Sequence, residues 1–589
     1  MAIDNLSYGN QLSLVQFFRR FFEILKPEAN FYWLSVVYGI GISLLSLATP
    51  ISVQMLINTV ANTALTAPLI VLSGSLFGLL ILFGLLNALR LHLMELFARR
   101  FYARMVAEIS LISVYAQNPF FGDTKSSALF NRYFDVINVQ IALPVLFIGG
   151  FTVVLQVAVG FVLVSLYHPL FLVFTLVMSA LIWVVWLTWG SRAIRTGIDL
   201  SHAKHDTAAW LESIGGSNGF FKSQRRIDYA LDKTDDYTKS YIDQRKRHFR
   251  QHFSQSLAFL LMYAGASAVL LGLGGWLVIQ SQLTLGQLVA AELVLSVAFF
   301  GVAQLGTYLT YFYDLCAAIE ELTLFYDVDQ EDPSGADPVL GSDHTLKFSS
   351  VRGDARHEEA ELNFEIPGGS IVMASASHHG VQRLFTNIIK MHELPKSGIA
   401  TMGGIDFQDI ESHNLRNNIH VLERPSFVGM TIREYLSLSC PNSAPKRMVG
   451  ALETVGLMET VSTFEHGLDT PVAATGYPFS SVELQQLKLA NALLEQPRVL
   501  VLSRLFDLLD EENLAAAVKE LRDQAYSTVI YFSNRRIDLG FDSFLYLEAS
   551  QQRFFDNFDE FCMAVNGKPP RRPAGPRLLA ADAVKSGGD

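Results

Sequence analysis

The sequence has little cysteine and little charge. Its three cysteines, Cys316, Cys440 and Cys562, are scattered over 589 residues, so neither a disulfide framework nor a cysteine metal-binding spacing is indicated. Charged residues make up only 17% of the chain and the formal net charge is -11, which argues against a nucleic-acid partner. No secretory leader is expected, because polar and charged residues interrupt the first thirty positions and no cleavage site precedes the first apolar run.

Long apolar runs are abundant. Hydrophobic residues make up 50% of the chain and the mean hydropathy is +0.29, which is too apolar for a soluble protein and too polar for a purely membrane-embedded one. Six runs are each close to the ~20 residues that cross a bilayer as a helix, and Pro50 is expected to kink the first. They are Leu34–Leu56, Leu69–Leu89, Leu143–Tyr167, Leu170–Trp189, Leu257–Ile279 and Leu288–Tyr308.

Lysine and arginine are missing from the loops on one side of these runs, Ile57–Pro68, His168–Pro169 and Gln280–Gly286. The opposite side is basic, and basic loops face the cytoplasm. We therefore predict a multi-pass protein of the cell (inner) membrane with both termini cytoplasmic. The basic residues include Arg19, Arg20, Arg99, Arg100, Arg104, Arg192, Arg195 and the cluster Arg245–Arg250.

The composition changes along the chain, and these changes predict the domain boundaries. Residues 1–30 contain an amphipathic segment that is expected to lie at the membrane interface, or alternatively to be an ordinary surface helix. Residues 31–328 form the membrane domain, and the Pro/Gly/Asp-rich residues 329–343 form a linker. Short strands alternate with amphipathic helices over 344–565, which indicates an α/β domain, and residues 566–589 are predicted to be a disordered tail.

Five polar side chains lie inside the apolar runs and form the candidate transport cavity. Glu292 is the sole acid well inside a run, and a carboxylate in lipid is costly unless it faces a cavity or a partner. It could be a substrate or proton site, or it could form a hydrogen bond between helices as a protonated acid. The five candidates are Gln54, Asn87, Gln156, Glu292 and Gln304.

The stretch Gly467–Asp510 resembles the ATPase core of ABC transporters. It has a polar loop, a helix at Val482–Leu494, an apolar strand at Val499–Leu502 and an aspartate, Asp510, in the family's order. The family's LSGGQ signature is replaced by FSSVE, in which only Ser480 remains and Ser481, Val482 and Glu483 follow. The family's Asp-Glu pair after the strand is replaced by Ser503-Arg504.

The loops between the membrane runs resemble those of ABC exporter half-transporters. The first carries Phe120-Phe121, Arg132 and Asp135, and the second carries Glu212, Gly215 and Lys222. The resemblance spans about residues 20–560 and implies an all-α six-helix membrane domain followed by an α/β ABC ATPase-like domain. It also implies that the loop tips near Gln117–Gly122 and Gly215–Phe221 dock on nucleotide-binding domains, unless they are only structural hairpins.

The phosphate loop expected by this resemblance lacks its functional residues. Such a loop needs several glycines, a lysine for the β- and γ-phosphates and a Ser or Thr for magnesium. With Gly380 as the last glycine, Val381 takes the lysine position and Gln382 the Ser/Thr position; a shift of one residue gives Gln382 and Arg383. The helix N-terminus could still bind an anion weakly, or the loop could pack on itself. The remaining residues of this vestigial loop are Ala376, His378 and His379.

Other positions of the site are also changed. The family's loop glutamine is Glu423 in one register and Arg424 in another, and the switch histidine is Asn534. No aromatic residue in Val351–Glu358 could stack on adenine. The resemblance therefore implies no catalytic residue, no metal and no bound ATP or Mg²⁺, hence a pseudo-ATPase. Glu423 and Arg504 could pair across the vacated pocket, or both could point to solvent.

Three functions remain open. The first is an exporter-like membrane transport protein that works without its own ATP hydrolysis, driven by a gradient. The second is a non-catalytic subunit or scaffold of a heteromeric ABC transporter or another membrane complex. The third is a conventional ATP-driven exporter, which the changed motifs disfavour. The family works as dimers, so the expected partners are membrane lipid and either a second copy or another ABC half-transporter.

Overall fold

The computed structural model describes residues 14–63, 66–117, 129–331, 341–355, 358–423, 427–439, 444–524 and 527–566. The chain divides into two compact units, Met1–Glu331 and Asp332–Asp589, and the boundary falls inside the predicted linker. Several predicted features lie outside the described residues: most of the first loop tip with Phe120-Phe121, Arg424, Cys440 and the C-terminal tail.

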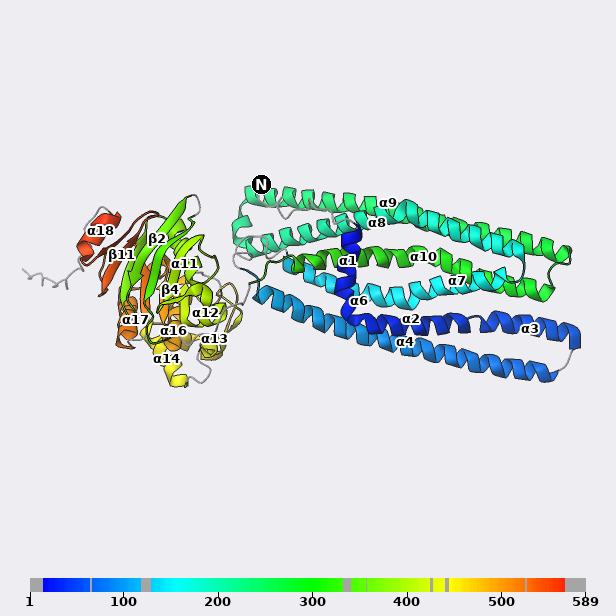
Figure 1. The fold of residues 1–589 in the computed structure, drawn as a ribbon, viewed down its shortest axis with the longest axis horizontal. Helices are drawn as coiled ribbons and strands as arrows, with labels where there is room; N and C mark the ends of the chain where they lie inside the picture. The colour runs from blue at the N-terminus through cyan, green and yellow to red at the C-terminus, as the bar shows by residue number, and fades with distance from the viewer. Residues whose placement is uncertain are drawn as a thin grey trace, which may run out of the picture. The chain divides into compact units, whose positions relative to one another are not determined.

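The first unit consists of long helices that run alongside one another (Figure 1). A short helix, α1, precedes them and crosses the bundle. The α-helices are α1 (Leu14–Leu25), α2 (Ala29–Leu45), α3 (Ala48–Thr63), α4 (Thr66–Val114), α6 (Asp135–Val145), α7 (Phe151–Ser165), α8 (Pro169–Gly216), α9 (Gln224–Ile279) and α10 (Leu285–Tyr326).

The described helices include six candidate membrane spans. Five of them contain one predicted apolar run each, and the third ends at Ser165, two residues before the end of the run Leu143–Tyr167. The first span is broken between α2 and α3, and Pro50 sits in the first turn of α3, where its missing N–H costs nothing. Pro144 lies near the end of α6, directly before a π-helical turn at Leu146–Gly150. A proline removes one helical hydrogen bond, which accounts for the irregular turn there.

Four helices are far longer than a bilayer requires. Helices α4, α8, α9 and α10 have 49, 48, 56 and 42 residues, so at ~1.5 Å per residue each is more than twice the ~30 Å of the hydrocarbon core. The surplus carries the charged residues, which extend α8 and α9 out of the membrane to a turn at Asn218–Lys222. This turn overlaps the predicted second loop tip.

The second unit contains two main sheets. The six-stranded sheet has the order β12-β11-β3-β10-β9-β6, and the four-stranded sheet has the order β2-β1-β4-β5. Strands β3 (Ile371–Ala376), β9 (Val499–Leu502) and β10 (Thr528–Phe532) are buried along their whole length, as expected for parallel strands covered on both faces. The remaining strands are β1 (Leu346–Asp354), β2 (Glu359–Ile366), β4 (Ser397–Met402), β5 (Ile405–Asp406), β6 (Ile419–Leu422), β7 (Met430–Thr431), β8 (Pro471–Val472), β11 (Ser543–Leu547) and β12 (Gln552–Phe555).

Helices pack on these sheets, and two of them border the expected nucleotide site. Helix α11 (His379–Ile389) follows β3 and α16 (Ser481–Glu495) precedes β9. In open α/β sheets, ligands bind beyond the carboxyl ends of the parallel strands. The expected nucleotide site therefore lies at the carboxyl ends of β3 and β9. The other helices are α12 (Ser412–Asn418), α13 (Ile432–Ser439), α14 (Pro445–Thr454), α15 (Met458–Thr463), α17 (Glu511–Gln524) and α18 (Phe558–Asn566).

Candidate functional site

The segment at the phosphate-loop position forms hydrogen bonds as part of the six-stranded sheet. Strand β3 continues to Ala376, which pairs with Leu547 of β11, and the amide of Ser377 donates to the carbonyl of Leu547 at 2.9 Å. Helix α11 then begins at His379. A loop that wraps phosphates points its amides at the ligand, whereas this amide is committed to a neighbouring strand.

With Gly380 as the last glycine, the side chains at the lysine and Ser/Thr positions face the protein interior; in the shifted register the lysine position, Gln382, is buried and the Ser/Thr position, Arg383, is exposed. Val381 is 0% exposed and belongs to the apolar core between the sheets, and Gln382 is 5% exposed. Gly380 lies against the main chain of Ala355, since a Cβ added there would meet the Ala355 carbonyl oxygen at 2.6 Å. The first turn of α11 is therefore packed against protein where a phosphate would need space.

Arg504, at the position of the family's catalytic glutamate, contacts the same segment. Its Nη2 atom donates to the main-chain oxygen of Ala376 at 3.0 Å. Its Nε atom is buried and has no hydrogen-bond partner among the residues that the structure describes. Ser503, at the magnesium position, is buried and its hydroxyl accepts from the amide of Leu505 at 3.4 Å. The end of β9 therefore presents a cation and a hydroxyl instead of two carboxylates.

The hypothesis that Glu423 pairs with Arg504 is wrong. Glu423 forms an ion pair with Lys390, the residue that follows α11, and no contact with Arg504 is found in the described part of the chain. The alternative, that both side chains point to solvent, is also wrong, because each is half-buried and has its own partner.

His378 bridges two parts of the expected nucleotide site. Its Nε2 atom lies 2.5 Å from Oε1 of Glu358, which belongs to the segment where an adenine-stacking residue is expected. His379 and Arg383 are exposed, whereas Ala376 is buried.

Asp507 organises the end of β10 and was not singled out from the sequence. Its carboxylate accepts hydrogen bonds from the hydroxyls of Tyr531 and Ser533, the latter at 2.6 Å, and from the amide of Asn534 at 3.1 Å. Arg535 donates to the Asp507 carbonyl at 2.8 Å. Asn534, at the switch-histidine position, is thus held through its main chain.

The signature position forms a helix cap. The Ser480 hydroxyl accepts from the amide of Glu483 at 3.3 Å, and the Glu483 carboxylate accepts from the amide of Ser480 at 2.8 Å and from Thr460 at 3.1 Å. Burial alone would raise the pKa of Glu483, but these hydrogen bonds outweigh it and lower that pKa. The carboxylate therefore places a negative charge at the start of α16, where the family binds a partner's phosphate; Ser481 and Val482 form the first turn.

The five candidate cavity residues are half-buried, and no hydrogen bond joins any two of them in the described chain. Gln54 accepts from the hydroxyl of Tyr167 at 3.0 Å. Glu292 accepts from Ser296 at 3.2 Å, one turn along α10, and its other oxygen is buried without a hydrogen-bond partner. The same carboxylate thus has one satisfied and one unsatisfied oxygen. Gln156 and Gln304 have no hydrogen-bond partner among the described residues.

A buried arginine lies beside Asn87. Arg90 is 2% exposed, and it donates to the hydroxyl of Thr152 on α7 and to the side chain of Asn87 at 3.1 Å. Asn87 itself donates to the Phe83 carbonyl at 2.9 Å. Arg90 directly follows the predicted run Leu69–Leu89, and an arginine at such a position usually marks the membrane boundary.

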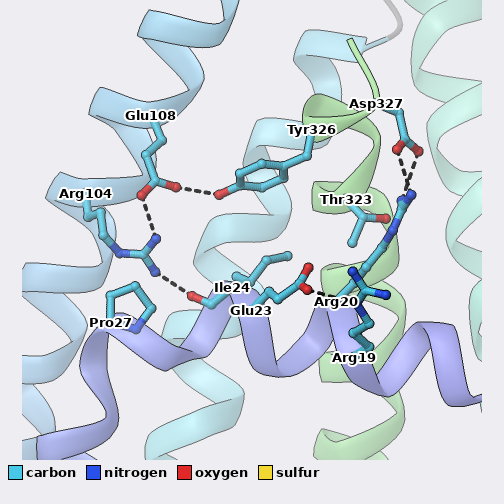
Figure 2. A pocket seen from close by; sticks show the side chains of 10 residues that line it. All are labelled: Arg19, Arg20, Glu23, Ile24, Pro27, Arg104, Glu108, Thr323, Tyr326 and Asp327. Carbon is cyan, nitrogen blue, oxygen red and sulfur yellow. Dashed lines mark hydrogen bonds and ion pairs between the residues drawn. The ribbon is translucent and has the colours of Figure 1, made fainter. Parts of the chain in front are cut away.

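A charged cavity of ≈ 540 Å³ lies where α1 meets α4 and α10 (Figure 2). Arg104 of α4 is its anchor: it donates to both carboxylate oxygens of the fully buried Glu28, to the Ile24 carbonyl at 2.7 Å and to Glu108 at 2.8 Å. Arg20 of α1 pairs with Asp327 at 2.8 Å. The middle of α1 and the segment at its C-terminal end are therefore tied to the bundle by ion pairs.

The predicted loop residues Arg132 and Asp135 are buried. Arg132 Nε lies 3.0 Å from Glu321 of α10. Asp135 contacts His205 at 2.5 Å and Lys204 at 2.9 Å, both on α8. These contacts join three helices in the part of the bundle that extends out of the membrane.

Comparison with known proteins agrees with this architecture. A family model described as the ABC transporter transmembrane region matches residues 32–302. A solved structure of a bacterial Atm1-family ABC exporter with ATP bound has a similar fold, with a TM-score of 0.76 over 88% of this chain and 94% of that chain, at 17% sequence identity. The chain therefore has the fold of an ABC half-transporter. It is a multi-pass membrane protein with a six-helix domain followed by a sheet-and-helix domain.

Curated relatives are distant. The ABC multidrug transporter mdr2 of Aspergillus fumigatus is 26% identical over 43% of this half-transporter and 33% of its own length. The uncharacterized ABC transporter ATP-binding protein YknU of Bacillus subtilis is 24% identical over 55% and 57%. The lactococcin-A transport/processing ATP-binding protein LcnC of Lactococcus lactis is 21% identical over 85% and 70%. The matches thus span about a third to seven-tenths of these relatives.

Proposed function

We propose that this half-transporter is an exporter-like membrane transport protein that works without hydrolysing ATP in its own soluble domain. The observation that carries the proposal is the contact of Arg504 with the carbonyl of Ala376. It puts a cation at the position of the general base and fastens it to the expected phosphate loop. Phosphoryl transfer depends on positioned charges and metal ions, and here the groups that would supply them are replaced.

Burial supports the same proposal. Val381 and Gln382 stand at the lysine and magnesium-hydroxyl positions and are packed in the interior. Reaching a nucleotide would require these side chains to leave the core. We therefore expect neither ATP nor Mg²⁺ to bind at this position.

The signature position at the start of α16 leads to the same expectation. In the family, the signature of one chain contacts the nucleotide of its partner. Here Glu483 already fills the positive end of α16 with its own carboxylate, and a second anion there is repelled. This half-transporter would therefore also fail to complete the site of an active partner.

The first measurement is binding and hydrolysis of radiolabelled Mg-ATP by the purified full-length chain in nanodiscs, with an intact ABC exporter as a positive control. We expect neither binding nor turnover above the background of empty nanodiscs. Saturable binding without hydrolysis would change the proposal to a nucleotide-sensing subunit. Robust hydrolysis would overturn it.

A second candidate is a non-catalytic subunit that pairs with another ABC half-transporter, and helix α4 favours a partner of some kind. The most apolar stretch of α4 has no buried residue within the chain. Gly74 and Gly78 form a G-x-x-x-G spacing on it, and a Cβ added at either would meet nothing within 4 Å. Such spacings allow close packing of a second membrane helix.

The two candidates differ in what the partner is. Mass measurement of the chain purified from native membranes, with Gly78→Leu as the disrupting variant and Gly272→Leu as the control, separates them. A complex with twice the mass of the chain favours a homodimer. A complex that contains a second polypeptide of different mass favours the function as a subunit. A monomer in both wild type and variant would contradict both.

A further inference from the structure

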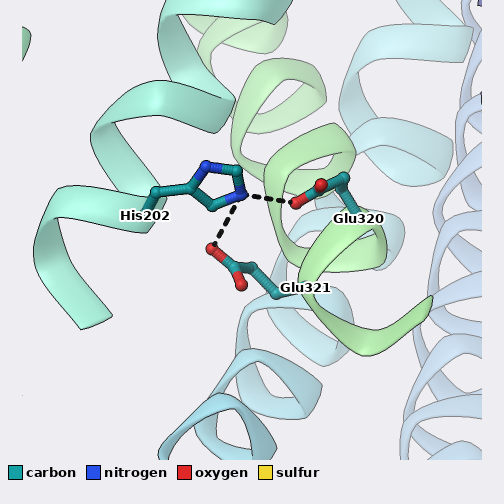
Figure 3. A group of neighbouring side chains, drawn as sticks. All are labelled: His202, Glu320 and Glu321. Atoms are coloured by element: carbon teal, nitrogen blue, oxygen red, sulfur yellow. Dashed lines mark hydrogen bonds and ion pairs between the residues drawn. The ribbon is translucent and has the colours of Figure 1, made fainter. Parts of the chain in front are cut away.

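Three acid–base side chains meet where α8 and α10 pass each other outside the apolar runs. His202 comes from α8, and Glu320 and Glu321 are consecutive in α10 (Figure 3). The Nε2 atom of His202 lies 2.9 Å from Glu320 and 3.7 Å from Oε1 of Glu321, and the three ligand atoms lie within 4.8 Å of one another.

Glu321 gives the second, independent observation. Its side chain is 0% exposed, Oε2 forms an ion pair with Arg132 Nε at 3.0 Å, and Oε1 has no hydrogen-bond donor in the part of the chain that the structure describes. Oε1 lies 3.7 Å from His202 Nε2, which is beyond hydrogen-bond distance. A buried carboxylate oxygen without a donor is costly, and a cation between His202 and Glu321 would remove that cost.

We propose that His202, Glu320 and Glu321 bind one divalent transition-metal ion of the zinc class. One imidazole and two carboxylates are the mixed nitrogen and oxygen ligands that suit zinc, whereas magnesium and calcium take oxygen ligands almost alone. Ligand atoms that each lie ~2.0–2.2 Å from a zinc ion are at most about 4 Å apart, and both His202 separations are within that limit.

The surrounding charges favour a cation. Glu320 and Glu321 bring two negative charges and Arg132 brings one positive charge, so a neutral imidazole leaves a net negative site. Arg132 takes the place of the outer partner that orients a ligating carboxylate. All three ligands sit on long helices, which hold them in place, and the fourth position is left for water.

The site goes beyond the proposed transport function, because it joins two helices that both enter the membrane. An occupied site would fix the spacing of α8 and α10 at one point. Without metal, a protonated His202 could bridge the same two carboxylates as an imidazolium, and that alternative predicts no metal affinity.

The test is zinc titration of the tag-free full-length chain in nanodiscs at pH 7.5, in competition with a chromophoric chelator. We expect one Zn²⁺ per chain with micromolar or tighter affinity. His202→Asn should weaken binding at least 10-fold, and His168→Asn, at the other end of α8, should not change it. Cobalt added in place of zinc should give visible ligand-field bands that His202→Asn abolishes.

If His202→Asn does not fold, the variant Glu320→Gln tests the metal site instead. The Glu320 side chain is 17% exposed, and its replacement by glutamine removes one ligand with little change of shape. Absence of stoichiometric zinc binding at 10-fold excess metal would overturn the proposal. Equal affinity in wild type and in the folded variant would also overturn it, and would mean adventitious surface binding only.

Discussion

Arg504 and Ala376 are joined by a hydrogen bond of 3.0 Å between the guanidinium and the main-chain carbonyl. The two residues are 128 positions apart and come from the ends of β9 and β3. The bond fastens the loop between β3 and α11 to the strand whose end would carry the general base. Each of the two positions thereby constrains the other.

Replacing Arg504 by glutamate restores the family's base but should not restore hydrolysis. The new carboxylate would face the Ala376 carbonyl, so we expect a loss of about 1–3 kcal/mol in the free energy of unfolding. Thermal melting and ATP turnover of the full-length chain measure both effects. Arg447→Glu, an exposed change on α14, is the control and should melt like wild type; turnover by Arg504→Glu would contradict the prediction.

Asp507 should be a stability residue rather than a catalytic one. Replacing it by asparagine removes the charge that accepts bonds from Tyr531, Ser533 and the Asn534 amide. We expect roughly 2–3 kcal/mol of destabilisation, because buried donors lose a charged acceptor. Asp523→Asn, exposed on α17, should have almost no effect. An unchanged melting temperature for Asp507→Asn would show that the hydrogen bonds accepted by Asp507 contribute little to stability.

Arg104 should hold helix α1 against the helical bundle. Arg104→Ala leaves the fully buried Glu28 without its cation, and removing one partner of a buried pair costs about 3–5 kcal/mol. Limited proteolysis of nanodisc samples should cut α1 faster in this variant. Arg99→Ala removes an exposed pair with Glu95 and should cost at most ~0.5 kcal/mol. Equal proteolysis rates for the two variants would contradict this prediction.

Glu483 should make the soluble unit sensitive to acid. The capping hydrogen bonds lower its pKa, so its contribution to stability is complete above the ordinary pKa of a glutamate and is lost as the pH falls through the lowered value. We expect Glu483→Gln to lose about 1 kcal/mol at neutral pH and to show less acid sensitivity. Melting temperatures measured from pH 7 down to pH 3 test this.

Glu453→Gln is the matched control, because Glu453 is exposed on α14. It should reproduce the wild-type curve. If Glu483→Gln and wild type lose stability in parallel as the pH falls, the cap does not determine the acid response.

The membrane architecture was predictable because it depends on contiguous sequence. Each span is a run of apolar residues long enough to cross a bilayer, so its existence needs no knowledge of partners. A kink was predicted at Pro50, but the first span breaks earlier, after Leu45, and Pro50 lies in the first turn of the next helix. Ser480 and Glu483 carry the local signal of a helix cap, a serine followed three residues later by glutamate, but this signal was not used to predict the start of α16.

The candidate site was less predictable because its contacts join distant segments. Glu423 had a plausible partner in Arg504 from family positions, but Lys390 lies nearer in the fold. Asp507 and the His202 cluster carried no motif, and only the packing of strands and helices brings their partners together. The sequence offered one usable signal, Arg132, which was noted for its resemblance and whose buried carboxylate partner is Glu321.

The bond between Arg504 and Ala376 bears on how the protein would respond to the state of the cell. If this domain binds no nucleotide, as proposed, a change in the ratio of ATP to ADP would not shift its conformational equilibrium. The half-transporter would then keep the same conformation in energy-depleted and in growing cells.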